Sequence, residues 1–334
     1  MSVDPRVYAV LVNYGRSDDT RECLDSLFCI TGAQLHVVLI DNGSPDDSAR
    51  TLALWLAERG GVSEEMVAAG GWFSVESFSG LSSFSAKFVA TSNNLGFAGG
   101  CNVGIRIALQ DPECNYVWLL NNDTTVEADA ISAMVDRFND DDKIGMCGST
   151  LVYNDPKDVI QACGGRFNTA LGRGRALGAY RSRTDLPSQE IIERAMDYVV
   201  GASMLVSRDF LLHVGEMDER YFLYFEELDW AIRAKSLGYK LGWAPTSVVI
   251  HKEGRAIGTS TLGRPSDLSI YFMTASYLRL VMAHQPWLIP LAMVRSATNI
   301  VKWFVRRDHA AATAVTRGII GFVTSPREHR PTSR

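Results

Sequence analysis

The segment KFVATSNNLGFAGGCNVGIRIAL, residues 87–109, contains a strand, a glycine-rich turn and a helix in direct succession. Its first five residues, Lys87–Thr91, are apolar enough for a buried strand, and we expect the helix to extend through Leu109. Glycines at the start of a helix let the backbone approach a ligand closely, and the unpaired N–H groups there can bind phosphate. Because glycines also make tight turns without a ligand, this segment alone favours neither interpretation.

Other apolar strands of the first half lead into helices in the same way. The expected strands are Val7–Val12, Val37–Ile40 and Tyr116–Leu120, and the expected helices run to about Cys29 and over Asp46–Glu58. Strands alternating with helices at this spacing predict an α/β fold with a doubly wound, mostly parallel sheet. Ligands of such sheets bind outside the carboxyl ends of the strands. The Gly- and Ser-rich stretch Gly60–Ser85 breaks this rhythm, and we expect an irregular insertion there.

The pattern changes after Lys143 to strands separated by loops. A helix over Glu226–Leu237 and a strand over Ser247–Ile250 follow. Past Leu268 the chain becomes helical, and aromatic side chains mix with basic ones. We therefore expect a sheet domain over residues 1–265 and a helical, basic segment over residues 266–334.

The charge of the chain is unevenly distributed. The net charge is −5, which argues against a general nucleic-acid-binding protein. From Arg279 to the end there are nine Lys or Arg and two acidic residues, a charge of +7 that leaves −12 for the rest. A basic tail on an acidic body predicts contact with an anionic partner such as a membrane surface.

The cysteines and the apolar runs favour a cytoplasmic protein. The six cysteines form no CxxC pair or metal-ligand spacing, which is typical of buried free thiols in a reducing compartment. The N-terminus enters a strand without a signal peptide, and the longest C-terminal apolar run, Trp287–Val294, is too short to span a bilayer. We expect the protein in the cytoplasm, free or held on the inner face of the cytoplasmic membrane.

Two acidic residues follow strands of the predicted sheet. The carboxylate of Asp41 can accept the imide N–H of uracil or thymine, although a lone Asp-Asn-Gly is more often an Asx turn. Asp123, at the end of Asn121-Asn122-Asp123, can hold a divalent ion against a diphosphate, and here too a simple turn is the alternative.

The densest acidic cluster is FEELDW, residues 225–230, at the start of a predicted helix. Carboxylates at that position complement the helix dipole, so capping is one interpretation. Adjacent aromatic residues indicate partial burial, however, and a carboxylate in that setting can act as the general base for an acceptor hydroxyl. His251 ends the strand Val248–Ile250 and is either structural or a metal ligand.

The order of these elements is more specific than any one of them. Asp41, NNLGFAGGCNVG from Asn93, NND, DYVVGASML from Asp197, FEELDW and His251 together resemble the family 2 glycosyltransferases, which have the GT-A fold. The resemblance extends over about residues 7 to 256 and is strongest to the rhamnosyltransferase-like branch. It implies a nucleotide-binding half over about residues 1–125 and an acceptor half over about residues 126–265.

The resemblance also implies roles for particular residues. Asp41 would read the base, within a nucleotide-binding set of Val12, Asn13, Asp41, Asn94, Gly96, Gly99, Gly100, Asn102 and Asn122. Asp123 and His251 would bind Mg²⁺ or Mn²⁺. Glu227 would be the catalytic base, with Glu226 as the alternative, and the acceptor side would comprise Gly201, Ala202 and Asp229. Two positions depart from the family pattern, because Asn121 replaces the first acid of the DXD-type element and Glu227 stands where Asp is commoner.

The predicted function is an inverting, metal-dependent transfer of one sugar from a pyrimidine nucleotide diphosphate. dTDP-rhamnose is the first choice of donor and a UDP-hexose the next, and the acceptor is a cell-surface glycan or a lipid-linked glycan. The alternatives are a sugar-phosphate nucleotidyltransferase and a non-catalytic glycan-binding protein of the same fold. Val12–Arg16 lacks the glycine-rich run of the former, and a binding protein has no need of all the acids above. The C-terminal helices would contact membrane or form a homodimer.

Overall fold

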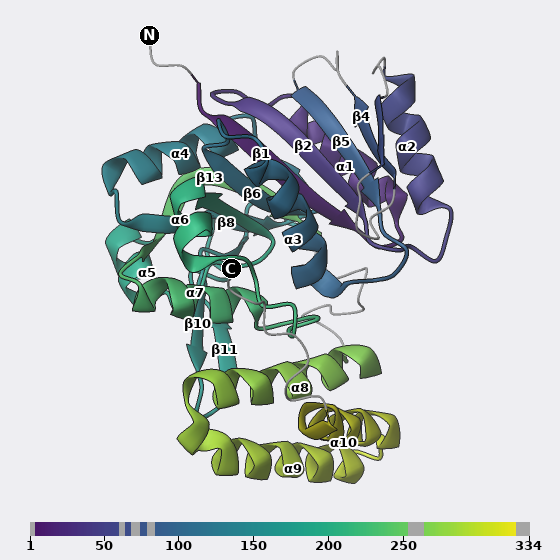
Figure 1. Ribbon diagram of the computed structural model, residues 1–334. Helices are drawn as coiled ribbons and strands as arrows, with labels where there is room; N and C mark the ends of the chain where they lie inside the picture. The colour runs from purple at the N-terminus through teal and green to yellow at the C-terminus, as the bar shows by residue number, and fades with distance from the viewer. Residues whose placement is uncertain (1–3, 60–63, 68–73, 79–83, 253–263, 325–334) are drawn as a thin grey trace.

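A computed structural model describes residues 4–59, 64–67, 74–78, 84–252 and 264–324 of the chain. Helices cover both faces of an 11-stranded sheet, and a separate layer of helices, formed by the end of the chain, lies below one side of it (Figure 1). The last four residues of the expected resemblance, 253–256, and the tail cations Arg327, Arg330 and Arg334 lie outside the described residues.

The first half of the sheet is parallel, as predicted. Strands β1 (Arg6–Asn13), β2 (Gln34–Asp41), β5 (Phe84–Ala90) and β6 (Tyr116–Asn121) lie in the order β5-β2-β1-β6. The connecting helices are α1 (Ser17–Leu27), α2 (Ser48–Glu58) and α3 (Gly96–Leu109). Parallel pairing brings the carboxyl ends of these strands to one edge, where Asn13 is the register partner of Asp41.

The second half of the sheet is mixed rather than parallel. Strand β12 (Ser203–Ser207) pairs antiparallel with both β6 and β8 (Ile144–Tyr153). Strand β13 (Lys240–His251) is parallel to β8 and antiparallel to β7 (Thr124–Val126). Strand β7 follows β6 after only two residues, Asn122 and Asp123, a connection too short for a parallel crossover. Asp123 therefore lies at the turn between two strands.

The insertion at residues 60–85 is not irregular throughout, so that expectation was wrong. It contains β3 (Glu64–Val67) and β4 (Ser74–Phe78), which pair antiparallel with each other. Strand β4 also pairs antiparallel with β5 and so extends the sheet at that edge. The rest of the insertion before residue 84 lies outside the described residues. Its Gly- and Ser-rich composition concealed the strands, since those residue types are depleted in strands.

Two apolar layers hold the sheet between its helices. Helices α1, α2 and α4 (Ala130–Asp140) pack on one face, and α3, α5 (Gln189–Ala195), α6 (Arg208–Val214) and α7 (Glu226–Ser236) pack on the other. The fully buried Trp118, Trp230 and Trp243 each donate their indole N–H to an oxygen at 2.9–3.2 Å, so burial leaves no polar group of these rings unpaired. All six cysteines are free thiols, and all but Cys29 are buried.

A small hairpin joins the sheet domain to the C-terminal helices. Strand β9 (Ile160–Ala162) pairs with β8, and β10 (Gly165–Asn168) and β11 (Arg173–Ala176) form a separate two-stranded sheet. The helical layer consists of α8 (Asp267–His284), the short turn η1 (Pro286–Leu288), α9 (Ile289–Val305) and α10 (His309–Thr324). Helix α8 faces the sheet domain, and α9 lies on the far side of the layer (Figure 1).

The apolar helical segment near the C-terminus is longer than the sequence predicted. The 20 residues Pro286–Val305 form a helical stretch that is long and apolar enough to cross a membrane by those criteria alone. The apolar run Trp287–Val294 had predicted a segment too short to do so. The difference arises because the helix continues through Arg295 and Lys302 into a second apolar run.

Candidate active site

Side chains at the carboxyl ends of β1, β2 and β6 form one hydrogen-bonded network. The buried amide of Asn13 donates to Asp41 Oδ1 at 2.8 Å, and its oxygen accepts from Thr20 Oγ1 at 2.7 Å. Asn122 donates to the oxygens of both Asn13 and Thr20, at 3.3 and 2.8 Å. Three residues of the predicted nucleotide-binding set, Asn13, Asp41 and Asn122, therefore lie together.

Asp41 closes a turn with the residues that follow it. Its Oδ1 accepts from Ser44 Oγ at 2.6 Å and its Oδ2 from the Ser44 backbone N–H at 3.1 Å. Ser44 Oγ in turn accepts from the N–H of Gly15 at 2.8 Å. These contacts are those of the Asx-turn interpretation, and they hold the carboxylate rigidly at the strand end.

The glycine-rich turn is a packed junction between two segments far apart in sequence. Asn42 donates to Asn94 Oδ1 and to the carbonyl of Gly96, at 3.1 and 2.9 Å. Gly96 has φ +75°, and a Cβ there would lie 2.3 Å from the carbonyl oxygen of Phe222. The N–H of Phe97 donates to that same oxygen at 2.8 Å. Only glycine fits at residue 96, and this contact holds the turn against the segment that precedes α7.

Two more glycines of this turn are required by close packing. A Cβ on Gly100 would lie 2.8 Å from Val12 Cγ1, and one on Gly99 would lie 2.8 Å from the Leu95 side chain. Val12 thus contacts the first turn of α3.

Asn102 does not lie with the predicted nucleotide-binding residues. It is buried, and its amide donates to the carbonyl of Met217 at 2.9 Å and to Glu219 Oε1 at 3.0 Å. Its oxygen accepts from the N–H of Met217 at 3.1 Å. These bonds use both amide hydrogens of Asn102 to hold residues 217–219 against α3, and its role in nucleotide binding stays a prediction.

Asp123 and His251 meet at the ends of neighbouring strands. His251 Nε2 lies 3.3 Å from Asp123 Oδ1, and His251 Nδ1 lies 2.8 Å from Gln161 Oε1. With Nδ1 protonated toward Gln161, Nε2 presents its lone pair to the carboxylate, and a cation shared by the two atoms would stabilise them. The donor set of one carboxylate and one imidazole therefore fits a divalent ion.

The protein supplies only part of a metal coordination sphere here. Within the described residues, no group of three or more His, Cys, Asp or Glu side chains is arranged to hold a metal ion. An ion at Asp123 and His251 would take its remaining ligands from a diphosphate and water, as is usual for Mg²⁺. Asn121 stands where the family pattern has an acid, and its amide nitrogen lies 3.4 Å from His251 Nε2.

Two adjacent carboxylates begin α7. Glu226 is buried and Glu227 half-buried, and the Oε2 atom of each has no hydrogen-bond partner among the described residues. Burial, together with the charge of Glu227, holds the pKa of Glu226 well above its usual range, and burial raises the pKa of Glu227 to about 7. Phe225 precedes them with φ +73°, a strained conformation for a bulky residue and common at functional sites.

Glu227 is the carboxylate that lies beside the predicted acceptor segment. A Cβ built on Gly201 would be 3.9 Å from Glu227 Oε1 and 3.8 Å from the ring of Phe97. The charge of Glu226 instead acts on Cys101 of α3. The side chain of Ala202 belongs to the apolar core, and its carbonyl accepts from the N–H of Asn121 at 3.0 Å. That bond links the acceptor segment to the strand end that carries Asp123.

Comparison with known proteins agrees with this arrangement. The model of the glycosyl transferase family 2 matches residues 74–186. An N-acetylglucosaminyl-diphospho-decaprenol L-rhamnosyltransferase of Mycobacterium tuberculosis is 23% identical over 295 residues, which are 83% of this chain and 85% of the relative. The protein is a glycosyltransferase of the family 2 type.

Other similar proteins are glycosyltransferases too. The hexosyltransferase Agl10 of low-salt glycan biosynthesis, from Haloferax volcanii, is 21% identical over 166 residues, about half of each chain. GalNAc-T7, solved with UDP, GalNAc and Mn²⁺, has a TM-score of 0.58 and 15% identity over 83% of this chain, which spans 47% of that protein. The mannosyltransferase PcManGT from Pyrobaculum calidifontis, solved with GDP-Man and Mn²⁺, has a TM-score of 0.53 and 13% identity. That match extends over 98% of this chain and 89% of PcManGT. These likenesses show the GT-A fold.

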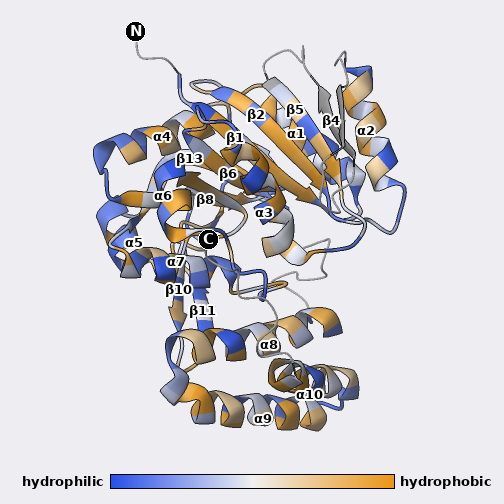
Figure 2. Cartoon of the chain, in the orientation of Figure 1, coloured by the Kyte–Doolittle hydropathy of each residue, from blue (hydrophilic) through white to orange (hydrophobic). Residues whose placement is uncertain are grey.

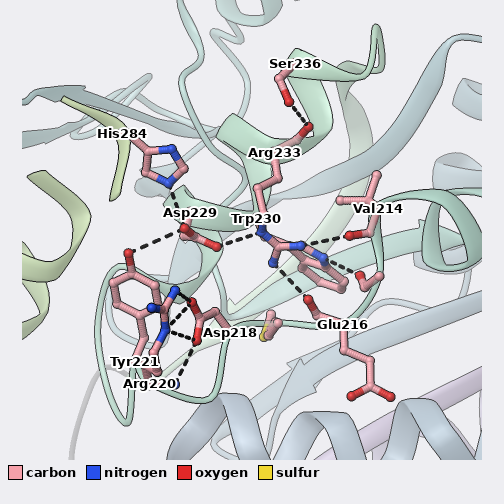
Figure 3. A network of polar contacts seen from close by, with 12 residues as sticks. Val214, Glu216, Asp218, Arg220, Tyr221, Asp229, Trp230, Arg233, Ser236 and His284 are labelled. Atoms are coloured by element: carbon pink, nitrogen blue, oxygen red, sulfur yellow. Dashed lines mark hydrogen bonds and ion pairs between the residues drawn. The ribbon is translucent and has the colours of Figure 1, made fainter. Parts of the chain in front are cut away.

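In this glycosyltransferase Asp229 has a different environment from the acceptor side predicted for it. Its buried carboxylate lies 2.8 Å from Arg233 Nε, 2.7 Å from His284 Nε2 and 3.4 Å from the Tyr221 hydroxyl (Figure 3). Arg233 also donates to the carbonyls of Val214 and Glu216. Asp229 therefore joins α7, the segment before it and the end of α8, and both its oxygens are occupied.

Several residues of the site escaped the sequence analysis. Thr20 and Ser44 complete the strand-end network, Gln161 contacts His251, and His284 contacts Asp229. Lys252, next to His251, pairs with Asp19 at 2.8 Å and with Glu22 at 2.5 Å, which holds α1 against the end of β13. Ser44 could have been found, since Asp-x-x-Ser is a turn signature, but Gln161 and His284 have no local signal.

Removing the charge of Asp229 should destabilise the protein and loosen α8. Burial alone would raise the pKa of Asp229, but the hydrogen bond from His284 and the charge of Arg233 outweigh it, so the pKa is lowered. The stability gained from this carboxylate is present above its unfolded pKa of about 3.9 and is lost as the pH falls through the folded value. We expect Asp229→Asn to lower the free energy of unfolding by about 3–5 kcal/mol at pH 7, the cost of leaving a buried partner unpaired.

Urea unfolding of the wild type and of Asp229→Asn at several pH values measures this loss in the free energy of unfolding. The difference between wild type and Asp229→Asn should shrink as the pH falls below about 4, because Asp229 then binds a proton in the unfolded chain before it does so in the folded protein. Asp136→Asn, at an exposed position of α4, is the control and should change little. A constant difference from pH 3 to pH 7 would contradict an electrostatic role for Asp229.

Proposed function

We propose that the protein moves a single sugar from a pyrimidine nucleotide diphosphate to an acceptor hydroxyl, with inversion at the anomeric carbon. The observation that carries the proposal is the half-buried carboxylate of Glu227. It lies at the start of α7 beside Gly201, and the next residue, Ala202, accepts from the N–H of Asn121 at the strand end that carries Asp123. A base and an anion-stabilising site are the two elements that a single displacement needs.

The chemistry assigned to Glu227 is proton removal from the acceptor. As its carboxylate accepts the hydroxyl proton, the acceptor oxygen forms a bond to the anomeric carbon. The bond from that carbon to the diphosphate oxygen breaks on the opposite face, and the nucleoside diphosphate leaves with the bonding electrons. Its raised pKa suits Glu227 to this role, because a base with a pKa near the working pH is partly ionised and still binds the proton well.

Glu227 is assigned as the base rather than Glu226 because an acceptor hydroxyl can reach it more readily. Glu226 is 5% exposed, so an acceptor hydroxyl cannot reach it readily. Burial, together with the charge of Glu227, raises the pKa of Glu226. Burial and the charge of Glu227 raise the pKa of the Tyr198 hydroxyl, which therefore remains neutral.

The proposed cofactor is Mg²⁺ or Mn²⁺, held by Asp123 and His251. A divalent ion at that position supplies positive charge that stabilises the departing diphosphate. Support comes from the donor set of the two side chains and from the Mn²⁺ in the complexes of GalNAc-T7 and PcManGT.

The proposed donor carries thymine or uracil, with dTDP-rhamnose first and a UDP-hexose next. Asp41 supports a pyrimidine, because Ser44 and Asn13 fix its carboxylate as an acceptor for an imide N–H at the strand end. The L-rhamnosyltransferase activity of the Mycobacterium tuberculosis relative supports the sugar. The same relative supports an acceptor linked to lipid through a diphosphate, and a cell-surface glycan is the alternative acceptor.

Replacing Glu227 by Gln should reduce turnover by roughly 10²–10⁴-fold and leave donor affinity near that of the wild type, since only the proton acceptor is lost. Glu226→Gln is the matched control and should retain most activity, because Glu226 is buried and out of reach of the acceptor. In the wild type, kcat/KM should rise with pH through a pKa near 7, because the base acts when deprotonated. Near-normal turnover of Glu227→Gln with an inactive Glu226→Gln would transfer the role to Glu226.

Nucleotide and metal should stabilise the protein together. In thermal-shift titrations we expect dTDP and UDP to raise Tm more with Mn²⁺ than without it, and GDP to raise it least. Asp123→Ala should lose the increase in Tm that is due to Mn²⁺, and His251→Ala should lose part of it.

Transfer activity should stop in EDTA and resume with Mn²⁺ or Mg²⁺. Equal stabilisation by GDP would exclude the role proposed for Asp41, and full activity in EDTA would exclude the metal.

A further inference from the structure

Helix α9 carries an apolar face that no described residue covers. Six exposed apolar side chains lie along one side of the helix and its entry turn: Trp287, Leu291, Val294, Val301, Phe304 and Val305. Trp287 and Val305 are 72% and 75% exposed, values unusual for large apolar residues of one helix. In Figure 2 this helix forms the outer edge of the C-terminal layer, farthest from the sheet.

The opposite face of α9 is fixed to the protein. Ala292 and Ser296 are buried, and Ala292 packs in a cluster with Tyr277 and Phe322. Arg295 donates to the carbonyl of Gly172 in the β10–β11 hairpin at 2.8 Å. A helix held in this way along its length presents one side only, so it is suited to lie on a surface rather than to cross one.

Charge indicates what that surface is. Helix α9 contains no acidic residue, and the exposed Lys302, Arg306 and Arg307 follow its apolar face at the C-terminal end. Apolar side chains with Trp, flanked by cations, are typical of helices that lie in the headgroup region of an anionic membrane. We propose that the outer face of α9, with Leu171 at the neighbouring hairpin tip, docks the protein on an anionic lipid surface.

This proposal differs from the sequence-based expectation in its extent. The sequence predicted membrane contact for the C-terminal helices together, but one side of α8 is buried against the sheet domain and the other C-terminal helices. Its Ser276 donates to the carbonyl of Leu223 at 2.9 Å. Among the described C-terminal helices, α9 has the most exposed large apolar side chains.

Sedimentation with vesicles of phosphatidylcholine and phosphatidylglycerol tests the docking. The double variant Val294→Glu, Phe304→Glu should lose at least tenfold in partitioning to these vesicles. The control is Leu212→Glu, Ile191→Glu, two equally exposed apolar positions of α6 and α5 that should have no effect. Arg306→Gln, Arg307→Gln should weaken binding about fivefold per cation, at about 1 kcal/mol each. These variants change exposed positions, and thermal unfolding will verify that each remains folded.

Three outcomes would overturn the docking proposal. Wild type that ignores the anionic vesicles would do so, and so would an undiminished partitioning of Val294→Glu, Phe304→Glu. The third is a wild-type dimer by light scattering that the same variant dissociates, without any binding to vesicles. None of these measurements uses transfer activity, so the proposed function stands or fails separately.

A different observation, on the β10–β11 hairpin, leads to a second inference. Arg166 and Arg175 are directly opposite in its register, and Arg173 is opposite Asn168, so the three guanidinium groups share one face. All three are exposed, and among the described residues none forms an ion pair or hydrogen bond through its side chain. Like charges directly opposite destabilise a strand pair, so this face favours an anion. Phe167, on the other face, packs 5.2 Å from Phe225.

The hairpin connects the candidate acceptor side to the α9 layer. At one end the N–H of Gly165 donates to the carbonyl of Tyr198 at 2.9 Å, three residues before Gly201. At the other end Tyr277 donates to the carbonyl of Thr169 at 2.9 Å, and Arg295 bonds Gly172. In an acceptor that consists of a sugar, a diphosphate and a lipid in that order, the negative charge lies between the sugar and the lipid. The hairpin likewise lies between the candidate acceptor side and the α9 layer. We infer, resting on the proposed function, that the arginine face binds the diphosphate of a lipid-linked acceptor.

Acceptor kinetics test the arginine face. Arg166→Gln, Arg175→Gln should raise KM for a short-chain, diphosphate-linked acceptor by roughly 10–100-fold, as expected for lost hydrogen bonds between charged groups, and leave kcat and donor KM unchanged. With a simple glycoside that lacks the diphosphate, wild type and variant should have the same KM. Arg181→Gln, Arg194→Gln is the control with the same charge change at arginines already paired with acids.

Two outcomes would contradict the arginine proposal. An unchanged KM for the diphosphate acceptor would do so, and so would reduced binding to anionic vesicles with an unchanged acceptor KM, which would make the face a site for bulk headgroups. Loss of kcat with every acceptor would also contradict a binding role. Failure of the transfer reaction in the wild type would instead refute the proposed function itself.

Discussion

The buried carboxylate of Asp229 positions most of what surrounds the candidate active site. It joins α7, which begins with Glu226 and Glu227, to Arg233 and through it to the carbonyls of Val214 and Glu216. Through His284 it also reaches the end of α8, just before the turn into α9. A charge in the interior is tolerated only when it is paired and hydrogen-bonded, so the three partners and the helix that carries Asp229 form one unit. The candidate base and the helical layer are thereby held by the same side chain.

The strand ends show how amides and hydroxyls build a rigid site around few charges. Asn13 connects Asp41 with Asn122, and Asn42 connects β2 with the turn at Gly96. Because nearly every donor in this network has a partner, the carboxylate of Asp41 is fixed before any nucleotide binds. Glu226 and Glu227 are the opposite case, since each has a buried oxygen without a partner. Unsatisfied carboxylate oxygens beside an acceptor segment are costly for stability and are useful for moving a proton.

Much of the fold could be predicted from local patterns, and less of the site. The alternation of Val7–Val12, Val37–Ile40 and Tyr116–Leu120 with helices predicted the parallel half of the sheet, which the structure confirms. The strands β3 and β4 were missed because Gly and Ser conceal short strands. Asn102 and Asp229 have the residue types of binding sites, yet both hold protein segments together. Met217 is 115 residues from Asn102 and His284 is 55 residues from Asp229, and no local spacing indicates contacts of that range.

In the proposed reaction Glu227 deprotonates the acceptor, and the nucleoside diphosphate leaves from the opposite face in a single displacement. The anomeric configuration of the transferred sugar tests this directly, by NMR on the product of the full-length protein in comparison with the donor. We expect the inverted configuration. A product that retains the configuration of the donor would contradict it, because retention requires a second displacement or a different geometry at the anomeric carbon.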